Sequence, residues 1–351
     1  MRRGSPWVEG AAVGVVALAA LLVMDAYVRD SPEPRNDELI YELMARDPFD
    51  PHTFPFAYRV GLPTLVHVLP MDHELSFSLL AWLLSAGCAT LAYVLIRRFN
   101  AGRLLAAGLA FGIAISPVLF VVSLRQGAGV DPASVLVMFA GTLAIVDRRP
   151  LAFSLIVLVG CVFREAALFL VPFAYAVWAD RLWDPAALRT TLLASTPALV
   201  AYVALRAGIP TVARDQVLGY DSLIGGRVDV LREAFSAPGA PLRRMAFAFG
   251  PLWLVAPFAL RDLSFARRGL VLVACCLLAM TFALDWGRII FLAAPVFAVA
   301  SAWVLREHPR LAALTVTALV GLGVGYAVYM EDLGGAQDGI IDVGPAPYEI
   351  R

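Results

Sequence analysis

The sequence predicts an all-α fold, a polytopic bundle of transmembrane helices, on two observations. Of its 351 residues, 60% are hydrophobic and only 16% are charged, whereas a soluble domain carries about 25% charged residues. The apolar residues also come in runs of roughly 15–22, the length of a helix that crosses a bilayer. Strands of a membrane barrel would alternate apolar and polar residues, which these runs do not do.

We expect about eleven spans joined by mostly short loops, in a single domain covering residues 1–351. The apolar segments lie near residues 8–28, 75–96, 104–122, 132–146, 151–163, 165–178, 190–208, 245–260, 269–284, 288–305 and 311–330. The last residues, 331–351, are expected to form a flexible tail. The formal net charge is +0, which gives no indication of a nucleic-acid partner.

Arginines predict the orientation of the bundle. With a cytoplasmic N-terminus, the short inside loops contain Arg97, Arg98, Arg103, Arg148, Arg149, Arg181, Arg189, Arg261, Arg267, Arg268, Arg306 and Arg310. Positive charge in short loops favours the cytoplasmic side, while long loops are largely exempt. The two long loops, residues 29–74 and 209–244, are therefore expected outside. The sequence thus predicts a multi-pass plasma-membrane protein.

Residues 150–178 allow two interpretations. They could form one long span interrupted by Arg164 and Glu165, or a hairpin of two short helices. The hairpin keeps the later arginine-rich loops inside, so we prefer it. At about 1.5 Å per residue, each arm of such a hairpin is too short to cross a full bilayer alone.

The first external loop opens with a short charged segment, "RNDELIYELMARD" (35–47). Leu39, Ile40, Leu43 and Met44 recur at helical spacing, which predicts a short amphipathic helix. The stretch that follows, "DPFDPHTFPFAYRVGLPTLVHVLP", is rich in proline and aromatic residues. We expect it to lie along the membrane surface.

Charged residues outside the cytoplasmic loops gather at one level of the predicted bundle. They are Asp25, Asp37, Glu38, Arg59, Arg125, Asp131, Arg164, Glu165, Asp285 and Arg288. An ionised side chain at helix depth costs about 2.5–3.5 kcal/mol, so such residues persist when they pair, face water or bind a ligand. Arginine forks suit phosphate oxygens, and a carboxylate can take a proton from a hydroxyl. The pattern favours transfer of a group from a lipid-linked phosphate to a hydroxyl acceptor.

The segment "NDELIYELMARD" resembles the first external loop of integral-membrane glycosyltransferases with a GT-C fold, which use polyprenyl-phosphate sugars. In that class the loop carries an essential acid with a tyrosine one helical turn later, here Asp37 and Tyr41. The stretch "PFAYRVGLPTLV" resembles the aromatic–proline segment of the class. The helices "REAALFLVP" and "GRIIFLAAP" resemble its later arginine-bearing helices. The resemblance covers the layout of roughly the whole chain, although the chain is short for the class.

The resemblance implies a mannosyltransferase-like enzyme of glycan biosynthesis in the cell envelope that transfers a hexosyl or pentosyl group with inversion. Its donor would be a polyprenyl-phosphate sugar and its acceptor a glycan or lipid, among membrane lipids. Asp37 would be the general base, with Glu38 as the alternative. The remaining implied site residues are Arg59, Arg164 and Arg288 at the donor phosphate, with Tyr41, Tyr58, Arg125, Glu165 and Asp285 in support. No cofactor is indicated, and His52 beside Asp47 and Asp50 is a poor metal candidate.

Several of these residues have a structural interpretation as well. Asp37 and Glu38 are favourable charges at a helix N-terminus, and Arg59 could extend toward lipid headgroups. Asp285 and Arg288 could pair on one helix face. Arg164 and Glu165 point to different sides of a helix and need separate partners.

Asp131 precedes Pro132, a combination typical of a helix start. For Asp131 this structural interpretation is the one we favour, and Arg125 and Asp131 could together do no more than close a tight loop.

Two other functions remain open. A lipid or glycan transporter also uses intramembrane charge pairs, often with internal repeats and a site near the bilayer midplane. No repeat is evident in this sequence, and its charges are predicted toward one face. A non-catalytic membrane scaffold of the same fold is the third alternative.

Overall fold

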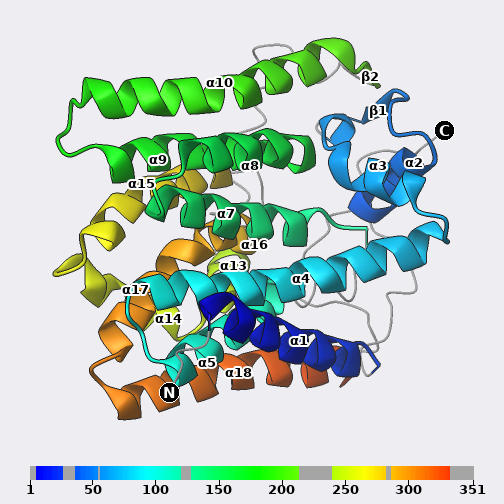
Figure 1. Cartoon of the computed structure of the whole chain (residues 1–351). Coiled ribbons are helices and arrows are strands. Elements are labelled where there is room, and N and C mark those ends of the chain that lie inside the picture. The colour runs from blue at the N-terminus through cyan, green and yellow to red at the C-terminus, as the bar shows by residue number, and fades with distance from the viewer. Residues whose placement is uncertain are drawn as a thin grey trace.

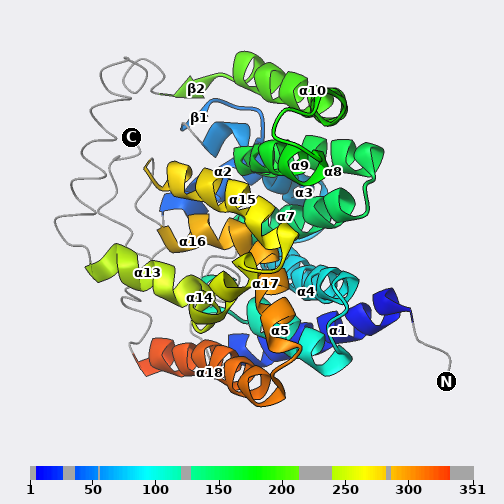
Figure 2. The ribbon, with the colours of Figure 1, turned by 90° about the vertical axis from the view of Figure 1, so that its left-hand side faces the viewer.

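The computed structural model describes residues 5–26, 36–53, 56–119, 128–212, 239–281 and 286–332. The described part is a helical bundle, so the all-α class is confirmed. A parallel pairing of β1 (His52–Thr53) with β2 (Thr211–Val212) is its one strand contact among these residues. Figure 1 shows the helices of the bundle from the side, and Figure 2 shows the bundle turned by 90° about the vertical axis.

Within the described ranges, five helices are long and apolar enough to cross a membrane. They are α1 (Pro6–Asp25), α4 (His73–Arg98), α10 (Pro185–Gly208), the combined stretch Trp286–Leu305, and Pro309–Val328 within α18 (Pro309–Asp332). These helices are consistent with a membrane protein.

Shorter helical elements account for the other predicted segments. They are α5 (Arg103–Ala114), α7 (Asp131–Val146), α8 (Pro150–Phe163), η2 (Glu165–Phe169) with α9 (Leu170–Trp178), α13 (Gly239–Phe249), α14 (Leu252–Val255), η3 (Ala256–Leu260) and α15 (Ser264–Met280). All eleven predicted segments overlap helical elements. Because many of these elements are shorter than a bilayer is thick, the number of spans stays a prediction.

Residues 150–178 form the predicted hairpin. The helix α8 ends at Phe163, Arg164 has an extended backbone, and η2 begins at Glu165. The rings of Phe153 and Trp178 then lie 5.3 Å apart, at the start of α8 and the end of α9. A single straight helix would separate these positions by more than 30 Å at about 1.5 Å per residue. The hairpin is therefore confirmed.

The predicted segment 245–260 is broken by a glycine. Gly250 has a positive φ of 48°, a conformation that glycine adopts without steric cost. Pro251 follows, and the chain continues as α14 and η3. One straight helix was expected here, and the structure replaces it with three short pieces.

The two long loops meet at one end of the bundle. The backbone of His52, from the first loop, pairs with that of Thr211 at the end of α10. Figure 1 shows β1, β2, α2 (Asn36–Arg46) and α3 (Gly61–Val68) gathered at this end. The arginine-rich loops lie at the other end, where Arg98 pairs with Asp147 at 3.0 Å and Arg103 with Glu9 at 2.8 Å. This arrangement fits the predicted placement of both loops on one side.

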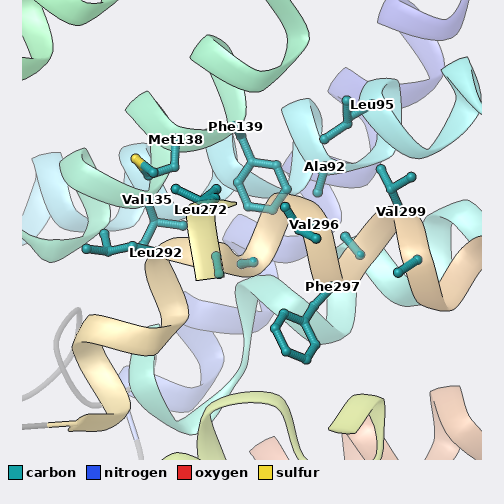
Figure 3. Close-up of a cluster of buried hydrophobic side chains, with 14 of the residues drawn as sticks. Ala92, Leu95, Val135, Met138, Phe139, Leu272, Leu292, Val296, Phe297 and Val299 are labelled. Carbon is teal, nitrogen blue, oxygen red and sulfur yellow. The ribbon is translucent and has the colours of Figure 1, made fainter. Parts of the chain in front are cut away.

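The helix α17 (Ala294–Leu305) runs through the centre of the bundle. Every residue from Ala294 to Ala302 is buried. Figure 3 shows side chains of α4, α7 and α15 packed against those of α17, and the ring of Phe139, from α7, is among them. Lipid gives apolar helices no hydrophobic drive to associate, so close packing of this kind holds such a bundle together.

Small residues let α1 approach α4 closely. A Cβ added at Gly14 would lie 3.0 Å from the carbonyl oxygen of Ala86, and one at Gly10 would lie 3.0 Å from that of Thr90. The spacing Gly-x-x-x-Gly is a recurrent packing motif of membrane helices. It fixes the N-terminal half of α1 against α4.

Candidate functional site

The amphipathic helix predicted in the first external loop is α2, and its apolar face packs on protein. Tyr41, Met44 and Ala45 are all at most 1% exposed. The ring nitrogen Nδ1 of His67, in α3, lies 2.9 Å from the carbonyl oxygen of Ala45. The helix is therefore fixed to α3 at the end of the bundle where the two long loops meet (Figure 1).

The middle of the stretch after α2 enters the bundle. Residues 57–63 are all buried, Arg59 among them at 8% exposure. A Cβ added at Gly61 would lie 3.0 Å from the carbonyl oxygen of Val162, so only glycine lets α3 approach α8 this closely. The surface placement predicted for the whole stretch is therefore wrong for residues 57–63, which pack inside the protein. Elsewhere in the stretch Phe49, Leu65 and Val68 are exposed, and their placement at the membrane surface stays a prediction.

Arg59 joins the first external loop to the tip of the hairpin. Its Nε and Nη2 atoms donate hydrogen bonds to the two carboxylate oxygens of Glu165, at 3.2 and 2.7 Å. Its Nη1 donates to the hydroxyl of Tyr41 at 3.2 Å. Burial alone lowers the pKa of the Arg59 guanidinium, but Tyr41 and Glu165 more than offset this and raise it well above the usual value. Arg59 is therefore a permanent cation, and it does not extend toward headgroups.

Arg164 and Arg288 share one carboxylate. The Nη1 atom of Arg164 donates to Oδ1 of Asp131, and Nη2 of Arg288 lies 2.9 Å from Oδ2 of the same residue. The exposed fraction of the side chain is 4% for Asp131, 12% for Arg164 and 13% for Arg288. Each oxygen of this buried carboxylate thus faces a different arginine.

The two networks are continuous because Arg164 and Glu165 are neighbours in sequence. We call the whole set the charge cluster: Tyr41, Arg59, Asp131, Arg164, Glu165 and Arg288. The prediction that Arg164 and Glu165 need separate partners is confirmed. Among the described side chains of the cluster, three arginines face two carboxylates.

Asp131 is the residue of the cluster that the sequence interpretation undervalued. It does begin α7, as predicted. It is also only 3% exposed and holds two arginines, so its structural interpretation as a helix start is incomplete. A buried carboxylate requires cationic partners. Arg164 and Arg288, which the sequence analysis assigned only to the donor phosphate, also need an anionic partner near lipid, and this was the signal that could have identified Asp131.

Tyr58 lies at the edge of the cluster. Its side chain is buried at 7% exposure, and the guanidinium of Arg206, from α10, stacks over its ring at 4.6 Å from the centroid. Arg206 was not predicted as a site residue. It extends the cationic surroundings of the cluster toward the second long loop.

Other predicted residues cannot be placed in full. Asp37 and Glu38 fall in α2, but their side chains lie outside the described part of the molecule, as do Arg125 and Asp285 altogether. The predicted pairing of Asp285 with Arg288 is thus untested, and Asp131 is one partner of Arg288. The ring Nε2 of His52 lies 2.8 Å from the backbone carbonyl oxygen of Asp47. No group of three or more metal-ligating side chains occurs among the described residues.

The fold and cluster define a helical protein with membrane-length apolar helices and a buried cationic site at one end. No family model matches the sequence, and no curated protein matches it either.

Proposed function

We propose that the protein is a membrane glycosyltransferase that moves a sugar from a polyprenyl-phosphate donor to a hydroxyl acceptor at the outer face of the membrane. The observation that carries the proposal is the pair of largely buried arginines, Arg164 and Arg288, held together by the carboxylate of Asp131. Planar guanidinium groups suit phosphate oxygens, and a second one adds geometric selectivity.

The proposed reaction is an inverting displacement. The acceptor hydroxyl gives its proton to the carboxylate of Asp37 as its oxygen bonds to the anomeric carbon. The bond from that carbon to the phosphate oxygen breaks, and its electron pair stays on the phosphate. The arginines stabilise the negative charge that develops there. Glu38 is the alternative base.

The location of α2 supports this assignment of roles. Tyr41 lies one helical turn after Asp37, and positions spaced by four residues share one face of a helix. The hydroxyl of Tyr41 accepts a hydrogen bond from Arg59, so this face of α2 adjoins the charge cluster. The proposal places the proton acceptor within the same end of the bundle as the cations.

Separate substitutions Asp37→Asn and Glu38→Gln test the function. The assay supplies a purified polyprenyl-phosphate sugar to the protein in detergent, with water and short alcohols as acceptors, and measures release of polyprenyl phosphate. Loss of the general base is expected to lower turnover by about 10²–10⁴-fold, while donor binding is retained. Glu307→Gln, at the opposite end and 69% exposed in its side chain, is the matched control.

The alternative functions give different results in the same experiments. A transporter would show no release of polyprenyl phosphate by the wild type and would lose flux across proteoliposomes on Asp37→Asn. A scaffold would show neither turnover nor flux. Either result would exclude the proposed transferase.

A further inference from the structure

Asp131, whose carboxylate is shared by Arg164 and Arg288, has no role in the transfer reaction proposed above. Its contacts nevertheless support a further inference, which rests on the proposed function. We propose that Asp131 is an internal anion that occupies the phosphate-binding pair Arg164 and Arg288. It holds both guanidinium groups in place and competes with a phosphate for them. Asp131 is thus a positioning residue that sets the affinity of the site for phosphate.

The geometry of the three side chains supports this role. Oδ1 of Asp131 accepts from Arg164, and Oδ2 faces Arg288 at 2.9 Å. A phosphate group also presents separate oxygens to two arginines. The carboxylate therefore makes with these cations the kind of contacts that a bound phosphate would make.

Burial makes the competition strong. The side chain of Asp131 is 4% exposed, so little solvent screens its attraction to the arginines. A ligand phosphate must replace at least one of these contacts to bind Arg164 or Arg288 directly. After sugar transfer the phosphate remains on the lipid, and the return of both arginines to Asp131 favours its release.

The charge balance of the cluster distinguishes Asp131 from a residue with only a structural role. Asp131→Asn removes the carboxylate that Arg164 and Arg288 share, and so makes the cluster more positive by one unit. A residue that only fastens helices would on removal loosen the site and weaken phosphate binding. An internal competitor would on removal strengthen it.

The first test measures binding of inorganic phosphate and of farnesyl phosphate to the purified full-length protein in detergent. Asp131→Asn is expected to tighten binding by about tenfold or more, since close charge pairs at interfaces couple by such amounts. Unchanged or weaker binding by the folded variant would overturn the proposal. Tighter binding of either phosphate compound by Asp131→Asn supports the proposal. A larger gain in affinity for farnesyl phosphate identifies a lipid-linked phosphate as the ligand. Equal gains in affinity for both compounds identify the phosphate group alone.

The matched control is Asp147→Asn. Asp147 also pairs with an arginine, Arg98, but at the other end of the bundle. This variant changes the net charge of the protein by the same amount as Asp131→Asn. It is expected to leave phosphate affinity unchanged, and an equal gain would show that total charge, not the local competition, sets the affinity.

A second comparison covers the case in which Asp131→Asn fails to fold, because removing one partner of a buried ion pair is strongly destabilising. Arg288→Gln leaves Asp131 with Arg164 alone and is expected to abolish phosphate binding. The double variant Asp131→Asn/Arg288→Gln removes the buried pair together and frees Arg164. Binding should return to at least the wild-type level, and a double variant that binds no better than Arg288→Gln would contradict the proposal.

These outcomes are separable from the proposed function. If the protein transfers no sugar but Asp131→Asn tightens phosphate binding, the glycosyltransferase assignment fails and the role of Asp131 stands. If transfer is found and the affinity does not change, the reverse holds.

Discussion

The guanidinium of Arg59 donates two hydrogen bonds to the carboxylate of Glu165, which lies 106 residues later in the chain. This contact joins the first external loop to the tip of the α8–α9 hairpin. The side chain of Arg59 is only 10% exposed and that of Glu165 is 33% exposed, so solvent is largely excluded from the guanidinium but reaches part of the carboxylate. The contact therefore contributes both to the stability of the fold and to the position of the charge cluster.

A double-mutant cycle on Arg59→Gln and Glu165→Gln measures this contact. Glu165→Gln is expected to lower stability by about 2 kcal/mol, because it weakens hydrogen bonds to a buried charge. The two substitutions together should cost less than the sum of the single losses. Thermal unfolding in detergent supplies the measurement, and additive losses would show that the two side chains do not interact.

Tyr41→Phe tests the hydrogen bond that the Tyr41 hydroxyl accepts from Arg59, which joins α2 to the charge cluster. The ring would keep its edge-on contact with Phe56, at 5.7 Å between centroids, but Arg59 would lose one acceptor. We expect a loss of about 1 kcal/mol in stability and a larger proportional loss of transferase activity. Tyr41→Ala, which also leaves a cavity, should cost about 3–5 kcal/mol. Full activity in Tyr41→Phe would contradict a positioning role for this hydroxyl.

Gly323→Ala tests the close packing of α18 on the end of α5. A Cβ at Gly323 would lie 2.3 Å from the carbonyl oxygen of Ile115, a backbone atom that cannot rotate away. Gly321, on the same helix, has no atom within 4 Å of such a Cβ. We expect Gly323→Ala to lower the melting temperature and Gly321→Ala to leave it unchanged or raise it, since alanine is the better helix former. Equal effects would mean that the two helices do not pack as described.

Cysteine labelling tests the orientation. A cysteine in place of Phe49, which is 60% exposed in the first long loop, should react with a membrane-impermeant maleimide in intact cells. One in place of Leu182, which is 82% exposed in the link between α9 and α10, should react only after the membrane is opened. Of the native thiols, Cys88, Cys161 and Cys276 are buried and Cys275 is partly so, and the wild type gives the background. The reverse pattern would place the candidate site in the cytoplasm.

The sequence predicts the helical segments well because their apolar runs are long and bounded by arginines. The break at Gly250 is harder to foresee, because a glycine within an apolar run is compatible with a continuous helix. The hairpin at Arg164 could be preferred from the arginine pattern alone. Its confirmation depends on the contact between Phe153 and Trp178.

The site could be predicted only in part. The arginines and Glu165 were predicted because ionised residues are expensive near lipid. Their partners were not, since Arg59 and Glu165, or Arg164 and Asp131, lie far apart in sequence and meet only through helix packing. Asp131 was interpreted as a helix start because the Asp-Pro pair already explained it locally.

The central claim is that a donor phosphate binds to Arg164 and Arg288, with the carboxylate of Asp37 facing it across the acceptor position. A density map of the protein with a bound polyprenyl phosphate tests this most directly. We predict phosphate oxygens within hydrogen-bonding distance of both guanidinium groups and the Asp37 carboxylate directed toward the same bound ligand. A phosphate bound elsewhere, or an Asp37 side chain that points into bulk solvent, would contradict the account.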